Sequence, residues 1–198
     1  IFIASKERVM RRPYADIVQK DSEVTLTAAQ KAAAHTIMTG EKPTLLFGVT
    51  GSGKTEVYLD CIQNTLKAGK SAIMLVPEIS LTPQVMRIFR SRFGDEVALL
   101  HSGLSDGERF DEWRRLLTGE AHVAVGARSA IFAPLTDIGL IVIDEEHDTS
   151  YISESNPRYK TREVAFFRAK YNGAKVVMGS ATPSVESFYA AEREKYTL

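Results

Sequence analysis

Short, largely apolar runs recur along the whole chain. Runs of this kind, bounded by polar, glycine or proline positions, are typical of strands that are buried on both faces. We predict strands at 44–47, 71–76, 97–100, 122–126, 140–143 and 174–178. The spacing between them leaves room for a helix after most of the runs.

The intervening segments repeat apolar residues every three or four positions, the period of a helix with one buried side. Capping boxes at 27–30 and 105–108 mark two helix starts, and the glycines at 40 and 173 mark two helix ends. Further helices are expected after residue 55, after residue 83 and from about 163 to 171. The last helix is predicted to start with Thr182 as its N-cap and Pro183 in its first turn.

Two of these helices have a predicted core-facing side. In the helix after residue 83 this side consists of Val85, Ile88 and Phe89. In the helix that Ser105 opens it consists of Phe110, Trp113, Leu116 and Leu117. At this spacing we expect Trp113 in the core rather than as a stacking platform for a ligand.

Strands and helices therefore alternate, at spacings typical of βαβ units. Such alternation predicts an α/β domain with a parallel sheet and helices on both faces. Ligands of such sheets bind outside the carboxyl ends of the strands. The polar clusters of the chain all follow predicted strands, so we expect them to share one edge of the sheet.

Composition adds limits to this picture. The chain has 198 residues, of which 44 % are hydrophobic and 25 % are charged, as in ordinary globular proteins. No apolar run approaches the roughly 20 residues that span a bilayer. The single cysteine, Cys61, excludes an intramolecular disulfide and a cysteine-cluster zinc site in this segment, and a cytoplasmic setting is expected.

The net charge of the chain does not indicate a polyanionic partner, because Lys+Arg and Asp+Glu both total 25. Residues 1–24 do carry a local basic cluster. We interpret 1–24 as a linker or the tail of a preceding domain, whose charges are either solvated or in contact with DNA. Residues 25–198 are then the folded domain. The chain lacks a starting Met and is expected to be part of a longer protein.

The segment 48–55 carries the most specific chemistry. It matches the phosphate-binding pattern G-x-x-x-x-G-K-[ST] between a predicted strand and a predicted helix. Its backbone N–H groups and the helix dipole would hold the phosphates of a nucleotide. The predicted ATP-binding residues are Gly48, Val49, Thr50, Gly51, Ser52, Gly53, Lys54 and Thr55, with Lys54 on the β- and γ-phosphates and Thr55 on Mg²⁺.

A second cluster follows the strand at 140–143. Asp144 is predicted to hold the Mg²⁺ together with Thr55, and Glu145 to orient or deprotonate the attacking water. Glu146 has no clear role from its position alone. We expect His147 to link the nucleotide site to Ser180 or Thr182.

The side chain of Gln30 has two possible roles, judged from its neighbours in the sequence. It is the last residue of the capping box and can bond back to the helix start. Alternatively, its amide offers the donor and the acceptor that would read the edge of an adenine.

These motifs resemble those of the DEAH-box-like helicases of superfamily two, and more closely those of the bacterial replication-restart helicases. The resemblance covers about residues 26–190. The segments that carry it are GVTGSGKTEVYL (48–59), LVPEISLTPQ (75–84), LHSGLSDGER (100–109), GARSAIFAP (126–134), IDEEHDTSY (143–151) and GSATPSVES (179–187).

The resemblance implies the first, RecA-like lobe of an ATP-driven 3′→5′ DNA helicase that acts at abandoned forks and D-loops and helps rebuild the primosome. It favours the adenine role for Gln30 and makes Glu146, His147, Ser180 and Thr182 coupling residues. It places Thr82, Ser102, Arg128 and Ser129 along the DNA track. Tyr151, Arg158 and Tyr159 fall in a loop that couples DNA binding to hydrolysis, although Lys160, Thr161 and Glu163 depart from the family pattern there.

The resemblance also implies parts that this segment does not contain. These are an N-terminal DNA-binding region, a zinc-binding insertion and a second helicase lobe that supplies an arginine finger. Implied partners are primosome proteins and single-strand-binding protein in the bacterial cytoplasm, with no membrane. Two alternatives are a double-stranded DNA translocase, which would not release a labelled strand from a fork, and a non-catalytic docking lobe, which has no need of Lys54, Thr55, Asp144 and Glu145 together.

Overall fold

A computed structural model describes Arg11 and residues 25–198. Apart from Arg11, the predicted linker at 1–24 lies outside the described residues. Among these residues no helix is long and apolar enough to cross a membrane.

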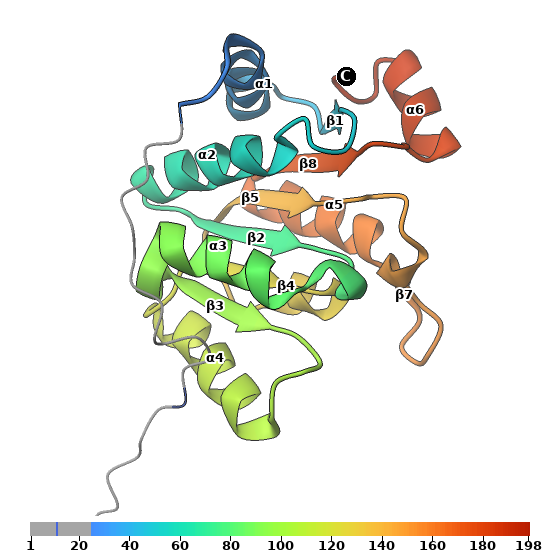
Figure 1. The fold of residues 1–198 in the computed structure, drawn as a ribbon. Helices are drawn as coiled ribbons and strands as arrows, with labels where there is room; N and C mark the ends of the chain where they lie inside the picture. The colour runs from blue at the N-terminus through green and yellow to red at the C-terminus, as the bar shows by residue number, and fades with distance from the viewer. Residues whose placement is uncertain (1–10, 12–24) are drawn as a thin grey trace, which may run out of the picture.

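The described residues form a six-stranded sheet in the order β1-β8-β5-β2-β4-β3, in which every pairing is parallel (Figure 1). This confirms the predicted α/β fold. The strands are β1 (Thr44–Phe47), β2 (Ser71–Leu75), β3 (Val97–Leu100), β4 (Val123–Gly126), β5 (Ile138–Ile143) and β8 (Lys175–Ser180). The predicted strands match them to within two residues at each end, because strands buried on both faces leave a continuous apolar run.

Helices cover both faces of the sheet (Figure 1). The main ones are α1 (Ala28–Thr39), α2 (Lys54–Lys67), α3 (Pro83–Phe93), α4 (Asp106–Thr118), α5 (Thr161–Asn172) and α6 (Val185–Glu192). Short 3₁₀ turns stand at η1 (Glu78–Ser80), η2 (Gly94–Glu96), η3 (Arg128–Phe132) and η4 (Thr149–Tyr151). Both capping boxes predicted from the sequence are present, at the starts of α1 and α4.

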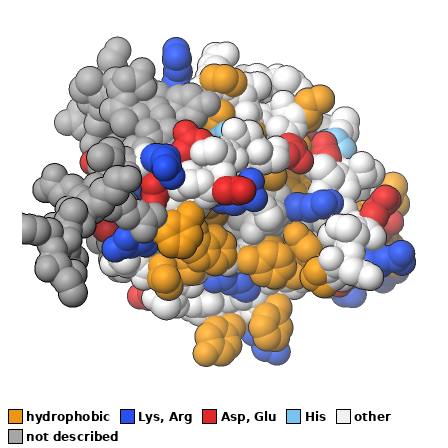
Figure 2. All heavy atoms as spheres, turned by 90° about the horizontal axis from the view of Figure 1, so that it is seen from below, with side chains coloured by type: hydrophobic (Ala, Val, Ile, Leu, Met, Phe, Trp, Pro, Cys, Tyr) orange, Lys and Arg blue, Asp and Glu red, His pale blue; other side chains and the backbone are white. Residues whose placement is uncertain are grey.

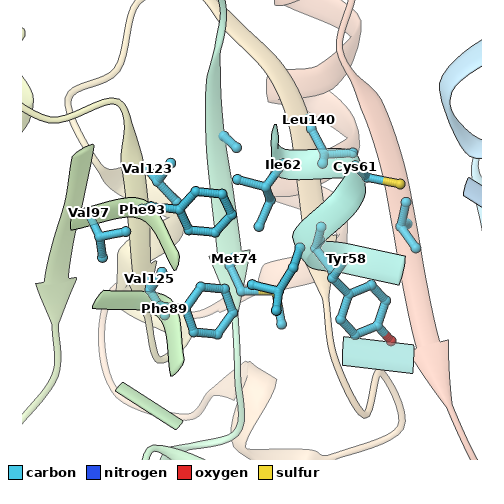
Figure 3. Packing of buried hydrophobic residues seen from close by; sticks show 14 of the residues in the cluster. Tyr58, Cys61, Ile62, Met74, Phe89, Phe93, Val97, Val123, Val125 and Leu140 are labelled. Carbon is cyan, nitrogen blue, oxygen red and sulfur yellow. The ribbon is translucent and has the colours of Figure 1, made fainter. Parts of the chain in front are cut away.

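Two apolar clusters lie on the two sides of the sheet. One contains Ile37 of α1, Ile62 of α2, Phe89 of α3 and Met74 of β2. Figure 3 shows Ile62 and Phe89 beside Met74. The other includes Ile131 of η3 and contacts from α4 and α5. Burying side chains of this size stabilises the fold by roughly 1.5–3 kcal/mol each, which fixes both helical layers to the strands.

Several local predictions need correction. In α3 the buried residues are Met86, Phe89, Arg90 and Phe93, whereas Ile88 is exposed. The N-cap of α6 is Ser184 and not Thr182, because the Ser184 hydroxyl accepts the N–H of Ser187. The loop after β5 contains an unexpected antiparallel hairpin of β6 (Ile152–Ser153) and β7 (Tyr159–Lys160).

The predicted buried side of α4 is confirmed only at Leu116. Phe110, Trp113 and Leu117 are exposed, and α4 buries Asp111, Glu112 and Arg115 beside Leu116. The reason lies in β3, the edge strand beside it. Arg115 donates to the carbonyl of Val97 at 3.0 Å, and Glu112 accepts the N–H of Leu99 at 2.7 Å. An edge strand leaves backbone groups unpaired, and this polar side of α4 supplies their partners.

Candidate functional site

The polar clusters that follow the strands do share one edge of the sheet. Because all six strands are parallel, their carboxyl ends point the same way. The phosphate-loop segment 48–55 follows β1, the cluster 144–147 follows β5, and Ser180 ends β8 between them. The strand order therefore brings together three segments that lie far apart in the sequence.

The phosphate loop has the backbone of an anion site. Gly51 and Gly53 have φ values of 79° and 81°, a left-handed conformation that favours glycine. The N-cap residue of α2 is Gly53, which has no side chain to cap the helix start, so an anion can approach the positive end of the helix dipole there. The Lys54 ammonium donates to the carbonyl of Gly48 at 2.7 Å, so its side chain lies across the loop.

Gln30 joins α1 to this loop. Its Oε1 accepts the N–H of Thr27 at 2.9 Å, which completes the capping box. Its Nε2 donates to the carbonyl of Ser52 at 3.2 Å. The capping reading is thus present in the structure, and the same amide also fixes the phosphate loop. The adenine role stays a prediction.

Asp144 is held from two sides by buried tyrosines. The Tyr58 hydroxyl of α2 donates to Asp144 Oδ1 at 3.0 Å, and the Tyr151 hydroxyl of η4 donates to the main-chain carbonyl of Asp144 at 2.8 Å. Burial raises the pKa of Asp144, and the nearby Lys54 charge opposes this shift. Burial also raises the pKa of Tyr58 well above its usual range, so the phenol remains a proton donor.

Gly179 of β8 makes room for this contact. A Cβ at position 179 would stand 1.6 Å from the Tyr58 hydroxyl oxygen. Any larger residue would therefore displace the phenol from Asp144. Neither Tyr58 nor Gly179 stood out in the sequence as a site residue, because the contact joins three separate elements.

The residues present fit Mg²⁺ held jointly with a nucleotide. Magnesium takes oxygen ligands and usually keeps one or two protein carboxylates, with the rest supplied by phosphates and water. The hydroxyl of Thr55 and the carboxylate of Asp144 are such donors. The described residues contain no group of three or more His, Cys, Asp or Glu side chains that could hold a metal on their own.

His147 lies between Glu145 on one side and β8 with the segment after it on the other. His147 Nδ1 lies 2.8 Å from Ser180 Oγ and 3.7 Å from a carboxylate oxygen of Glu145, while its Nε2 lies 3.5 Å from Thr182 Oγ1. We predicted a link from His147 to Ser180 or Thr182, and the structure places the imidazole within reach of both. Glu145 has φ = 44°, a strained conformation of a kind that clusters at functional sites.

Glu146 points the other way and is buried. Its Oε1 accepts the N–H of Ser184 at 2.7 Å, and its Oε2 accepts the hydroxyl of Ser187 at 2.8 Å. Arg162 Nη1, at the start of α5, lies 3.7 Å from Oε2 and donates to Ser187 Oγ. We call Glu146, Arg162, Ser184 and Ser187 the Glu146 clamp. We did not identify the other three residues of the clamp from the sequence. The only local signal was Ser184 followed three residues later by Ser187, a spacing that is common at the start of a helix.

The residues predicted to contact DNA separate into groups. Ser102, Arg128 and Ser129 line a hollow of about 390 Å³. Arg158 and Tyr159 line a second hollow of about 700 Å³ at the β6–β7 hairpin. Thr82 is exposed and caps α3, its hydroxyl accepting the N–H of Val85.

Tyr151 does not fit its predicted DNA role. It is 5 % exposed, and its hydroxyl is bound to the carbonyl of Asp144. Its ring therefore packs beneath the end of β5 at Asp144 instead of offering a surface to a ligand. A buried tyrosine and a stacking tyrosine look the same in a loop sequence.

The family model described as DEAD/DEAH box helicase matches residues 27–190. Among curated relatives, the replication restart protein PriA of Bacillus subtilis (strain 168) is 52 % identical over 98 % of the chain and 25 % of its own length. PriA of Synechocystis sp. is 46 % identical over 98 % of the chain and 24 % of its own length. The chain thus spans about a quarter of the length of these relatives.

Solved structures give the same fold. A structure titled RecG bound to three-way DNA junction matches with a TM-score of 0.60 and 26 % identity, over 90 % of this chain and 25 % of that one. The UvsW helicase from bacteriophage T4 matches with a TM-score of 0.58 over 82 % of this chain and 55 % of that one, and at 15 % identity it speaks to the fold alone.

Proposed function

The chain belongs to the DEAD/DEAH box helicase family, and on that premise we propose that residues 25–198 are the ATP-binding first lobe of an ATP-dependent 3′→5′ DNA helicase. The relatives named as replication restart proteins support a role at stalled or collapsed forks and D-loops, in reassembling the primosome. The observation that carries the proposal is the convergence of the phosphate loop and Asp144 at one edge of the sheet, where Tyr58, from the helix that follows the loop, donates to Asp144 Oδ1 at 3.0 Å.

Each residue then has a defined task. Lys54 binds the β- and γ-phosphates, and Thr55 and Asp144 hold the magnesium ion. When bound, Mg²⁺ supplies neutralisation of the charge that develops on the phosphates. Glu145 orients or deprotonates the attacking water, and Gln30 reads the adenine. The hydrogen bonds of His147 with Ser180 and Thr182, and the Glu146 clamp, connect this chemistry to β8 and α6.

DNA is the proposed polymer substrate. Thr82, Ser102, Arg128, Ser129, Arg158 and Tyr159 are the proposed contacts, and a structure of RecG bound to a DNA junction has the same fold at 26 % identity. Because the chain spans about a quarter of its relatives, a second lobe would complete the nucleotide site. Other primosome proteins and single-strand-binding protein are proposed partners, in the bacterial cytoplasm.

The test is nucleotide binding and steady-state ATP hydrolysis by this chain, with and without single-stranded DNA. Wild type is compared with Lys54→Ala, and with Lys67→Ala as a matched control at the exposed far end of the same helix. We expect Mg²⁺-dependent ATP binding that only Lys54→Ala abolishes, with slow turnover because half of the site is absent.

Two outcomes would contradict this proposal. Absence of nucleotide binding by the wild type would overturn the ATP-binding role. Brisk DNA-stimulated ATP hydrolysis that Lys54→Ala abolishes would show that the nucleotide site is complete in one lobe or through self-association. That result would overturn the proposal that the chain holds only half of the site.

A further inference from the structure

The unexpected orientation of α4 brings an aromatic side chain to the surface. Each residue of a helix turns by about 100°, so a helix that buries Glu112, Arg115 and Leu116 presents Trp113 at the border of its exposed side. The indole is 37 % exposed. Large aromatic rings usually gain most from burial, and an exposed one at the rim of a cavity is a feature of binding sites.

Trp113 lines the hollow of about 390 Å³ that also contains Ser102, Arg128 and Ser129. This volume falls within the roughly 300–1,000 Å³ of sites for small ligands. The hollow is built by the carboxyl ends of β3 and β4 and by the side of α4. The edge of the sheet that holds the proposed nucleotide site therefore continues into it.

The polar lining suits a nucleotide unit of a single strand. Arg109 lies one helical turn before Trp113; its side chain is about half exposed, and its guanidinium lies 3.7 Å from the carboxylate of the exposed Asp106. Among the described residues that line the hollow, Glu78 is the one acidic residue. The Arg128 guanidinium donates to the carbonyls of Ser150 and Ile152, neutral acceptors that leave its positive charge in place. These two cations, with the hydroxyl of the exposed Ser129, can hold a phosphate while the indole holds the base.

His101 adds a donor without an acceptor. It lines the hollow, and its Nδ1 accepts the N–H of Gly103 at 3.2 Å, which leaves the proton of the neutral ring on Nε2. Within the part of the chain that the structure describes, this buried Nε2 has no hydrogen-bond partner. Buried polar atoms without a partner are rare, and a ligand acceptor would satisfy this one.

The molecular surface agrees with this description. Helix α4 lies at the bottom of the molecule in Figure 1, and Figure 2 views the molecule from below. Exposed hydrophobic side chains gather in the middle of this face, with both basic and acidic side chains around them (Figure 2). Exposed aromatic side chains next to basic groups are a feature of surfaces that bind single-stranded nucleic acid.

We propose that this hollow is a nucleotide subsite of the DNA track, in which one base of a single strand stacks on Trp113 and its phosphate lies between Arg109 and Arg128. The subsite rests on the proposed function, since it assumes that the chain binds single-stranded DNA. It assigns roles to Trp113, Arg109 and His101, which no motif singled out as contact residues.

The chain offers a direct probe, because Trp113 is its only tryptophan. An oligo-dT is titrated into the chain while two signals are followed, the anisotropy of a dye on the DNA and the emission of Trp113. We expect the emission to be quenched in proportion to the anisotropy, because a stacked base contacts the indole. An oligonucleotide made only of abasic units should bind through its phosphates and leave the emission unchanged.

Substitutions measure the effect of stacking. Stacking of a base on an aromatic ring is worth about 1–3 kcal/mol, so Trp113→Ala should weaken binding of oligo-dT by about 5- to 150-fold. Trp113→Phe should restore most of the affinity, and neither variant should change the affinity for the abasic oligonucleotide. Leu117→Ala is the matched control, since Leu117 is exposed on the same side of α4 and does not line the hollow.

The outcomes separate the subsite from the function. Binding by anisotropy with unchanged Trp113 emission, or an equal affinity of Trp113→Ala and wild type, would overturn the subsite and leave the DNA-binding proposal standing. If Trp113 instead contacts a protein partner, DNA binding would likewise leave its emission unchanged, and Trp113→Ala would bind DNA as tightly as wild type. No binding of oligo-dT under any condition would overturn the DNA-binding role itself.

Discussion

The two halves of the sheet bury polar side chains for different ends. At the β1–β8–β5 half, the buried polar groups converge on two acidic residues: Tyr58 binds the carboxylate of Asp144, Tyr151 binds its main-chain carbonyl, and the clamp residues hold the carboxylate of Glu146. At the β4–β3 half, Glu112 and Arg115 bond instead to the backbone of the edge strand. Buried polar side chains thus position the candidate site in the first half of the sheet. In the second half they supply hydrogen-bond partners to the edge strand.

This difference has a physical cause. A buried charge needs partners, and those partners can be other side chains or free backbone groups. An interior strand such as β5 has both neighbours in place, so polar groups at its end are left for ligands and positioning. The edge strand β3 has one neighbour, and its unpaired groups take up the charges of α4. A charge near a strand end is therefore evidence for a site only when the adjacent backbone is already paired.

The largest expected effect tests the edge half. Arg115→Met leaves Glu112 as a buried charge without its ion pair, and breaking such a pair typically costs about 3–5 kcal/mol. We expect a loss of this size in the free energy of unfolding, measured by urea titration. Arg114→Met, at an exposed neighbouring position, should stay within about 0.5 kcal/mol of wild type.

The double variant Glu112→Gln/Arg115→Met sharpens the result. It removes both charges and keeps an acceptor for the Leu99 N–H, so it should be less destabilised than Arg115→Met alone. Equal stability of Arg115→Met and Arg114→Met would show that the pair contributes nothing to the fold, and the contrast between the two halves would fail.

A smaller effect on stability is expected in the site half. Glu146→Ala deprives Ser184 and Ser187 of a charged acceptor, and hydrogen bonds to charged groups are worth about 1.5–3 kcal/mol. We expect a loss of about 2–3 kcal/mol in urea unfolding and local loosening of α6, seen as faster amide hydrogen exchange at 184–190. Glu186→Ala, in the exposed first turn of α6, is the control. Unchanged exchange in Glu146→Ala would refute the clamp.

Tyr58→Phe tests positioning with little change in packing. The variant removes only the hydroxyl that donates to the Asp144 carboxylate. Loss of a hydrogen bond that orients a metal ligand typically lowers metal affinity by about 10–100-fold, so the half-saturating Mg²⁺ concentration for binding a fluorescent ATP analogue should rise by about tenfold or more. Tyr151→Phe removes a bond to the main-chain carbonyl of the same residue and should shift it less. Equal shifts would rule out a specific role for the carboxylate contact.

The smallest expected effect is on pH dependence. Burial lowers the pKa of His101. Between this lowered value and the usual pKa of about 6.5, the unfolded chain binds more protons than the folded chain. The contribution of His101 to stability is therefore lost as the pH falls below about 6.5. The melting temperature of wild type should decline more steeply over this range than that of His101→Gln, and parallel curves would contradict the assignment.

Much of the fold and the nucleotide site followed from local patterns in the sequence. All six strands of the main sheet could be predicted, because parallel strands with helices on both faces form nearly continuous apolar runs. The phosphate loop could be placed because its glycines, its lysine and its flanking elements lie within one short segment. In a parallel sheet, all the polar clusters that follow strands lie at the same edge. The strand order then decides only which of these clusters are neighbours.

The tertiary structure decided what depends on contacts between distant segments. The side of α4 that faces the core follows from the edge position of β3, which no local period reveals. With this side of α4 buried, Trp113 is partly exposed and lines the hollow beside it. Tyr58 reaches Asp144 only because Gly179 lies between α2 and β5 with no side chain in the way. The period of apolar residues indicates which side of a helix is apolar. Hydrogen-bond partners from elsewhere in the chain determine which polar side chains of that helix can be buried.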